Sequence, residues 1–241
     1  MDVYKRNWFG DVYRNGKLAN GELIPEVDTL QTGAYIKAEK HINQWFLGAG
    51  LRGDRYQTKA HEILKFSSKI TSTNDDVDYL PSGYITARYF LDDDMHLFGG
   101  VGYSVRIPTA VERYIQGSST FFGNPDLEPT RNTEVDVGFE MRTNRLNLRA
   151  KVFYSDLRDF IYQKQRAPGT ISWTNIDAHL FGGDIKALVD ILYGFSVEGA
   201  LAYQRGKKDS RPRYNNNENL AEIPPLKTKL ALHYERSGFF G

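Results

Sequence analysis

Alternation of apolar and polar side chains is the feature that most constrains what this chain can fold into. One face of Thr133–Met141 is apolar, and it consists of Val135, Val137, Phe139 and Met141. The other face consists of Glu134, Asp136, Gly138 and Glu140. Arg145–Ser155 repeats the pattern, with Leu146, Leu148, Ala150, Val152 and Tyr154 on its apolar face. Since successive side chains of a strand point to opposite faces, both segments are predicted to be strands with one apolar face.

A two-residue turn at Thr143–Asn144 is predicted to join these strands into a hairpin that keeps both apolar rows on one face. The cross-strand pairs expected from that turn are Met141–Leu146, Val137–Ala150 and Asp136–Lys151. The same alternation recurs in Leu30–Ala38, Trp45–Leu51, Ile85–Leu91, Met95–Val105, Phe195–Gln204 and Thr228–Tyr234.

Connections in the sequence also repeat, with one long hairpin about every fifty residues. Short turns are predicted at His41–Gln44, Asp92–Asp94, Thr143–Asn144, Asp190–Gly194 and Arg236–Gly238. Long polar loops are predicted at Gly10–Glu26, Gln57–Tyr79, Ile107–Arg131, Tyr162–Ile171 and Gly206–Ile223. Short turns at one end and long loops at the other are typical of an outer-membrane barrel. We therefore predict an all-β fold, an antiparallel up-and-down transmembrane β-barrel segment of about nine to eleven strands, most of them about 11–13 residues long.

Composition agrees with this fold and excludes several others. The chain has no cysteine and a formal net charge of +1, so disulfides and a basic stripe for nucleic acid are not expected. No apolar run approaches the roughly 20 residues of a membrane-spanning helix. A mean hydropathy of −0.52 is compatible with barrel strands, since only alternate residues face lipid. The first ten residues lack the apolar core of a signal peptide, which we interpret as an internal fragment.

Motifs for catalysis are absent from the sequence. It has no Gly-x-Ser-x-Gly elbow, no phosphate-binding glycine loop and no His-Glu-x-x-His. Its histidines show no ligand spacing, and the acidic runs Asn74–Asp78 and Asp92–Asp94 fit a hydrophilic loop and a charged turn better than a calcium site. We expect no enzymatic activity, no catalytic residue, no metal-ligating residue and no cofactor.

The Ile107–Arg131 loop carries the candidate binding residues. Pro108, Pro125 and Pro129 stiffen it, and Arg106 precedes it at the end of a strand. Arg106, Glu112, Arg113 and Tyr114 are predicted to line the inner wall at the mouth of the barrel, where arginine suits an anionic chelate. The alternative, which we favour, is that these residues only organise the loop.

The order of residues from Gly102 to Glu140 resembles a late extracellular loop and its flanking strands in TonB-dependent outer-membrane receptors. The resemblance is carried by Gly-Tyr-Ser-x-Arg-x-Pro, by Glu112-Arg113-Tyr114, and by the motif loop Gly123, Asn124, Pro125, Asp126, Leu127, Glu128 and Pro129, followed by Thr133-Glu134. Weaker similarities extend it to Ile24–Thr29, Trp45–Asp54, Val152–Ile161, Asn175–Asp184 and Ile223–Leu226.

This resemblance implies a 22-stranded barrel that is filled by an N-terminal plug. Residues 1–241 are expected to be a C-terminal part of that barrel, without the plug domain, the early strands and the last strands, and to have no transport activity alone. The implied partners are a metal chelate, the TonB complex through the absent plug and N-terminal segment, and lipid or lipopolysaccharide of a Gram-negative outer membrane.

Two questions remain open at the level of sequence. A ferric siderophore is the default substrate, while copper is the runner-up because Asn175–Asp184 and Ile223–Leu226 resemble the copper-receptor branch. A soluble β-rich binding or scaffold module without transport activity is the alternative class of function.

Overall fold

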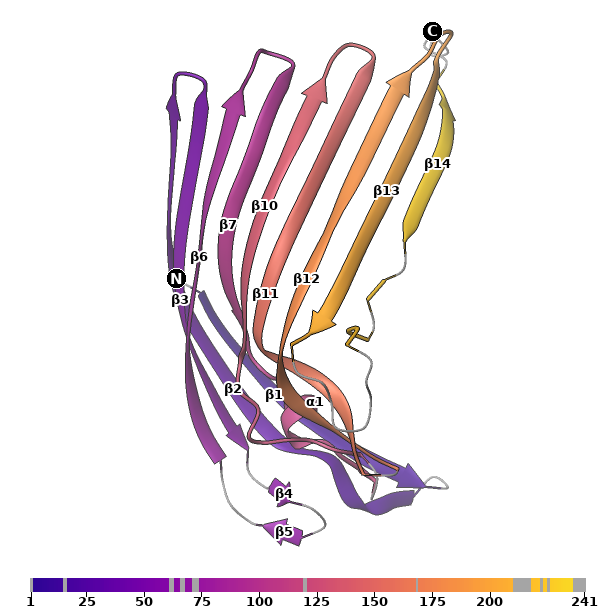
Figure 1. Cartoon of the computed structure of the whole chain (residues 1–241). Coiled ribbons are helices and arrows are strands. Elements are labelled where there is room, and N and C mark those ends of the chain that lie inside the picture. Colours follow the sequence, from indigo (N-terminus) through magenta and orange to yellow (C-terminus); the bar gives the residue numbers. More distant parts are fainter. Residues whose placement is uncertain are drawn as a thin grey trace, which may run out of the picture.

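A computed structural model describes residues 2–14, 17–60, 63–65, 68–70, 74–118, 121–167, 169–209, 218–221, 223–224 and 226–235. Long antiparallel strands lie side by side in one curved sheet (Figure 1). In sheet order they are β1 (Asp2–Arg14), β2 (Lys17–Ile42), β3 (Trp45–Ala60), β6 (Asn74–Phe90), β7 (Met95–Arg106), β10 (Thr130–Arg142), β11 (Leu146–Ala167), β12 (Thr170–Asp190), β13 (Phe195–Lys208) and β14 (Lys227–Tyr234). Each strand pairs with its predecessor in this order, which confirms the up-and-down antiparallel barrel segment.

The short turns all lie at one edge of the sheet, at the top of Figure 1. They join β2 to β3, β6 to β7, β10 to β11 and β12 to β13, where the sequence pattern predicts them. Tyr193 and Gly194 have positive φ angles of 57° and 81° and form the last of these turns. The turn predicted at Arg236–Gly238 lies outside the described residues.

The predicted register of the β10–β11 hairpin is wrong by two residues. Met141 pairs with Leu148, Val137 with Val152, and Asp136 with Phe153, while Lys151 lies opposite Gly138. The reason lies in Thr143, whose hydroxyl oxygen accepts hydrogen bonds from the backbone N–H groups of Arg145 and Leu146. Four residues, 143–146, lie between the last paired residues, Arg142 and Asn147, which is two more than predicted, and this shift by two preserves the assignment of side chains to faces.

Three of the predicted long loops are largely strand. β1 and β2 continue through most of Gly10–Glu26, β3 and β6 extend into Gln57–Tyr79, and β11 and β12 occupy nearly all of Tyr162–Ile171. Strand lengths therefore reach 26 residues in β2 and 22 in β11, well above those predicted. Backbone pairing continues because the hydrogen-bond ladder joins main-chain groups and does not require an apolar face. The predicted Gly206–Ile223 loop lies partly outside the described residues, and a small hairpin of β4 (Ile63–Lys65) and β5 (Ser68–Ile70) belongs to the Gln57–Tyr79 connection.

The two faces of the sheet differ as the alternation predicts. Val137 and Val152 pair with each other on the apolar face and are each 57% exposed. Neighbouring strands continue this row on the same face with Ile36, Leu51, Ile85, Val101, Ile185 and Leu201, all of which are exposed. Polar side chains such as Glu134 and Asp136 occupy the opposite face and are half-buried. An exposed apolar belt opposite a polar inner wall is the arrangement of a barrel that faces lipid.

One short helix, α1 (Ala110–Tyr114), and two short strands, β8 (Gln116–Ser118) and β9 (Phe121–Phe122), lie in the connection between β7 and β10. None of the helices in the described residues has the length and apolar character needed to cross a membrane.

Candidate functional site

The Ile107–Arg131 connection begins with the capped helix α1. The hydroxyl oxygen of Thr109 accepts from the backbone N–H of Glu112, and the Glu112 carboxylate accepts from the backbone N–H of Thr109 at 2.8 Å. This reciprocal capping box fixes the first turn of the helix. Arg106 donates two hydrogen bonds to the same carboxylate, at 3.0 and 3.1 Å, so Glu112 also holds the end of β7. The Arg106 side chain keeps 46% of its surface exposed.

Arg113 and Tyr114 point away from solvent and are only 5% and 3% exposed. Arg113 donates from Nη2 to the backbone carbonyl of Leu127 at 2.9 Å. Its guanidinium also lies 3.6 Å from a carboxylate oxygen of Asp78 and 3.9 Å from one of Asp76, both in β6. The acidic run Asn74–Asp78, predicted to be a loop, is thus part of β6, and its aspartates form ion pairs with Arg113. Tyr114 packs in an apolar cluster with Val27, Ala60 and Ala110.

Gly123 brings the start of the motif loop against α1. Its backbone N–H donates to the carbonyl of Ile115 at 2.8 Å, and that of Asn124 donates to the carbonyl of Glu112 at 2.9 Å. A Cβ at position 123 would overlap the carbonyl of Arg113, so only glycine permits this approach. The side-chain amide of Asn124 donates to the carbonyl of Trp173 in β12 at 3.1 Å.

Asn175 in β12 anchors the end of the loop. Its side-chain oxygen accepts from the backbone N–H of Glu128 at 2.9 Å, and its amide nitrogen donates to the carbonyls of Glu128 and Asp159 at 2.9 and 2.7 Å. Asp159 has a φ of 53° at a bulge in β11. Leu127 is fully buried, Pro129 is buried, Pro125 is half-buried and Asp126 is exposed.

The Ile107–Arg131 connection therefore links distant strands of the sheet. α1 packs against β2 and β6 at one end, and Asn124, Glu128 and β9 bond to β12 at the other. The loop spans the sheet from β2 to β12, and α1 lies near the lower ends of these strands in Figure 1. Its buried residues hold this bridge together, while Arg106 remains accessible at its base.

A hollow of about 560 Å³ opens on the inner wall, and Ile161 in its lining donates its backbone N–H to the hydroxyl of Thr130, at the end of the connection. Polar groups from three strands line it, including Asn132, Glu134, Ser155 and Gln204. Apolar side chains complete the lining, among them Phe153, Leu157, Phe160, Leu180, Leu220 and Ile223. Ser155 donates to the side-chain oxygen of Asn132 at 2.6 Å, which orders the polar part. A surface that mixes apolar walls with a few fixed polar groups is typical of a ligand site.

Lys208 lies beside this hollow and was not singled out by its sequence. It is 7% exposed, its ammonium lies 3.4 Å from the hydroxyl of Tyr162 and 4.8 Å from the centre of that ring. Among the described residues no carboxylate forms an ion pair with it. A buried cation held by an aromatic ring is a strong local attractor for an anion. One sequence signal could have identified it: Lys208 is four residues after Gln204 in the same strand, so both side chains lie on the inner face.

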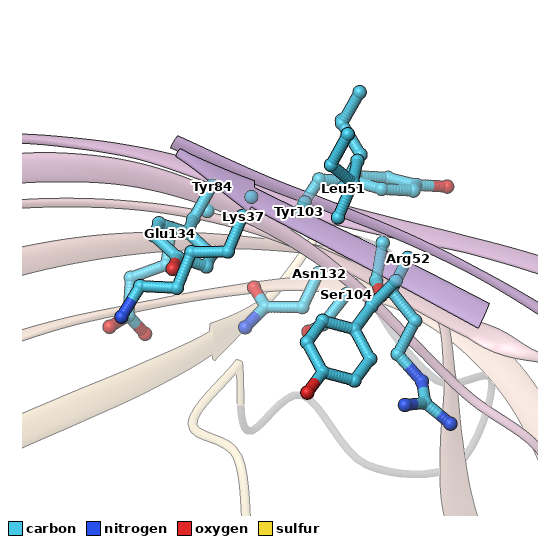
Figure 2. A pocket seen from close by; sticks show the side chains of 14 residues that line it. Lys37, Leu51, Arg52, Tyr84, Tyr103, Ser104, Asn132 and Glu134 are labelled. Atoms are coloured by element: carbon cyan, nitrogen blue, oxygen red, sulfur yellow. The ribbon is translucent and has the colours of Figure 1, made fainter. Parts of the chain in front are cut away.

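A second hollow of about 530 Å³ shares Asn132 and Glu134 with the first. Figure 2 shows that Lys37, Arg52 and Glu134 extend from one face of the sheet there, whereas Leu51 and Tyr103 extend from the other. Arg52 is bound to Asp54 at 2.6 Å, and Lys37 to Glu39 at 2.7 Å. Polar groups of the inner wall thus continue from β11 to β2, and the cations in this part already have carboxylate partners.

Charged residues next to the β11 bulge form a separate network. Arg158 donates to Asp156 at 3.0 Å and to Asp177 at 3.3 Å. The hydrogen bond to Asp156, together with the charges of both carboxylates, raises the pKa of the Arg158 guanidinium above its usual value. Within the described ranges, no group of three or more His, Cys, Asp or Glu side chains is arranged to hold a metal ion.

The sequence profile described as "TonB dependent receptor-like, beta-barrel" matches residues 2–241. The chain belongs to this family of TonB-dependent receptors. Members of the family are transporters of the bacterial outer membrane. No sequence among curated proteins matches the chain.

Solved structures of TonB-dependent receptors share this fold. The copper transporter OprC has 26% sequence identity and a TM-score of 0.75 over 88% of this chain and 33% of its own. The siderophore receptor PiuA from Acinetobacter baumannii has 15% identity and a TM-score of 0.68 over 90% of this chain and 32% of its own. The ferric yersiniabactin uptake receptor FyuA from Yersinia pestis has 17% identity and a TM-score of 0.65, with 87% and 32% covered. The chain thus spans about a third of the length of these receptors.

Proposed function

We propose that this chain forms part of the barrel wall of a Gram-negative outer-membrane receptor that imports a scarce metal chelate with energy from the TonB complex. Family membership and the exposed apolar belt support the membrane location. The belt also argues against a soluble β-rich module, because the apolar rows of the belt would face water in a soluble protein. The observation that carries the proposal is the inner-wall hollow, with Lys208 at its side, a cation that forms no ion pair with any carboxylate among the described residues.

A ferric siderophore is the substrate that the hollow favours. Such a chelate is bulky and often anionic, so it gains from apolar surface and from a cation that forms no ion pair within the described part of the chain. Tyr162 presents its ring and hydroxyl next to Lys208, which suits an aromatic or oxygen-rich ligand. The receptors PiuA and FyuA, named for a siderophore and for ferric yersiniabactin, have the same fold.

The loop residues divide between two roles in this proposal. Arg106 is the one that we expect to contact the chelate, because its guanidinium is partly exposed at the base of the loop. Glu112 orients Arg106 through its two hydrogen bonds. Arg113 and Tyr114 hold the loop on β2 and β6, so they act on ligand binding only through the position of the loop.

Copper is the second candidate substrate. The observation that favours it is the similarity to OprC, which at 26% identity and a TM-score of 0.75 exceeds that of the siderophore receptors compared above. A copper receptor would need soft or imidazole ligands at the site, and these would be supplied from other parts of the full receptor.

An uptake assay distinguishes these substrates. Cells that express the full-length receptor are supplied with a panel of radiolabelled ferric siderophores, with ferric citrate, or with radiolabelled copper. We expect Lys208→Met to reduce uptake of one ferric chelate by about tenfold at equal surface abundance, the effect of losing one charge-assisted contact. The adjacent Lys207→Met, whose side chain belongs to the opposite face of β13, is the matched control and retains uptake. Copper uptake without ferric chelate uptake would contradict the siderophore assignment.

A further inference from the structure

The chain that returns from β13 to β14 departs from the regular ladder beside the inner-wall hollow. β13 pairs with β14 up to Ala202 and Lys227, and Lys207 pairs with Asn219 beyond that point. Four residues of β13 (203–206) lie between these two pairs, against seven of the returning chain (220–226), so the register shifts by three residues. This return segment, residues 218–221 and 223–224, lies at the arrowhead of β13 in Figure 1.

Hydrogen bonds hold the return segment on the end of β13. The backbone N–H of Leu220 donates to the carbonyl of Gly206 at 2.9 Å, and the backbone N–H of Lys208 donates to the carbonyl of Glu218 at 2.8 Å. Gly206 permits this contact, because a Cβ there would lie 2.9 Å from the Cβ of Leu220 and 3.1 Å from the Cδ1 of Ile223. The segment is therefore fixed against the strand end that carries Lys208.

Apolar side chains gather under the return segment, on the inner face of the sheet. Leu180 in β12 pairs with Ser155, and Leu157 lies two residues further along β11, so both side chains belong to that face. Leu220 packs against Leu157 and is only 7% exposed, and Ile223 and Leu180 pack against the same cluster. The return segment thus forms an apolar wall together with β11 and β12.

The hollow has two chemically different sides. Across the register from β10 to β13, Glu134, Ser155, Leu180 and Gly206 lie in one row, and Ile223 lies over Gly206. The lining is therefore polar toward β10 and apolar toward β13. Leu180 and Ile223 are half-buried, since they border the hollow and keep apolar surface in contact with it.

A cation lies at the edge of the apolar side. Lys208 follows Gly206 by two residues in β13, so its side chain belongs to the same face, and it pairs in register with Ala178 of the apolar cluster. A ligand that fills the hollow therefore meets a positive charge and an apolar wall next to each other. This combination is complementary to an anion that carries an apolar substituent.

We propose that Leu180 and Ile223 determine specificity for a metal chelate that carries an acyl chain, with the chain on these side chains and the anionic head toward Lys208. Burial of the chain against this wall removes apolar surface from water on both partners, whereas a chelate that is polar throughout gains nothing from the wall. This assignment rests on the proposed import of a chelate and names the class of chelate.

The test uses the full-length receptor in lipid nanodiscs and pairs of synthetic ferric chelates that share one head. One member of each pair carries an acetyl amide and the other an octanoyl amide, and the heads are a tris-catecholate and a tris-hydroxamate. Calorimetric titration measures each affinity after subtraction of the signal from empty nanodiscs. Ile223→Asn and Leu180→Asn make the wall polar, and Ile223→Leu keeps it apolar. Leu226→Asn is the matched control, because Leu226 is 56% exposed and does not line the hollow.

Burial of about two methylenes strengthens binding roughly tenfold, so the wild-type receptor should bind an octanoyl chelate about tenfold or more tightly than its acetyl partner. Ile223→Asn and Leu180→Asn should lower this ratio to about two or less while the acetyl chelate still binds, which shows that both variants fold. Ile223→Leu and Leu226→Asn should keep the wild-type ratio.

Equal wild-type affinities for the acetyl and octanoyl chelates, or an unchanged ratio in both asparagine variants, would overturn the role of Leu180 and Ile223 and leave chelate import intact. Failure of every chelate to bind the wild-type receptor would contradict the proposed function and, with it, the acyl-chain assignment.

Discussion

Arg113 provides the sharpest test of how the motif loop is built. Substitution by methionine removes the hydrogen bond to the carbonyl of Leu127 and leaves Asp78 in β6 without its cation. A hydrogen bond from a charged donor contributes about 1.5–3 kcal/mol, and the Asp78 oxygen that lies 3.6 Å from Arg113 is itself buried, so the loss of its cation keeps the cost toward the upper part of this range. We therefore expect the loop to lose about 2–3 kcal/mol of docking free energy, or about 30- to 150-fold in its opening equilibrium.

Hydrogen exchange in the full-length receptor measures this equilibrium. The amides of Gly123 and Asn124, bonded to Ile115 and Glu112, should exchange about 30- to 150-fold faster in Arg113→Met. Arg106→Gln is the control, because its exposed ion pair contributes less than about 1 kcal/mol and its loss should leave these amides protected. Unchanged protection in Arg113→Met, combined with loss of chelate binding, would refute the structural role and make Arg113 a ligand contact.

Three further substitutions test other parts of the structure. Gly123→Ala forces a Cβ onto the Arg113 carbonyl, so protease cleavage within the loop should become faster in limited proteolysis of the folded receptor. Asn175→Ala removes three hydrogen bonds between the loop and β12, and a melting experiment should show a destabilisation of about 2 kcal/mol or more. Val152→Arg places a charge in the middle of the apolar belt and should cost about 2–4 kcal/mol in equilibrium unfolding from bilayers, while Lys151→Gln on the inner face should cost little.

Much of the fold could be predicted from the two-residue alternation of apolar and polar side chains in the sequence. In a barrel strand, apolar side chains face lipid and polar side chains face the lumen at alternate positions. The residue type therefore predicts the face of residues such as Val137 and Asp136. Pairing partners are less readable, since they depend on how many residues the turn contains. The side chain of Thr143 decides this by a local hydrogen bond that alternation does not encode.

Loop lengths could not be predicted, because the alternation of apolar and polar residues that predicts a strand ends at the edge of the apolar belt. Beyond it, β2 and β11 continue without the alternation of apolar and polar residues, and only backbone pairing distinguishes them from loops.

The sequence alone could not place the side chains of the candidate site. The motif from Gly123 to Pro129 pointed to this connection, but sequence cannot show that Arg113 is buried while Arg106 stays exposed. Lys208 lay outside every motif. It becomes a candidate only when Tyr162, which is 46 residues away in the sequence, is placed beside it.

Spin labels at four successive positions of β11 test the central claim, that the apolar face of this sheet meets lipid and the polar face lines the lumen. The chain has no cysteine of its own, so single cysteines at Lys151, Val152, Phe153 and Tyr154 can each be labelled within this segment. In the full-length receptor in bilayers, collision with oxygen should be high at 152 and 154, and collision with a water-soluble nickel chelate should be high at 151 and 153. Four labels with the same accessibility, or the opposite alternation, would contradict the account.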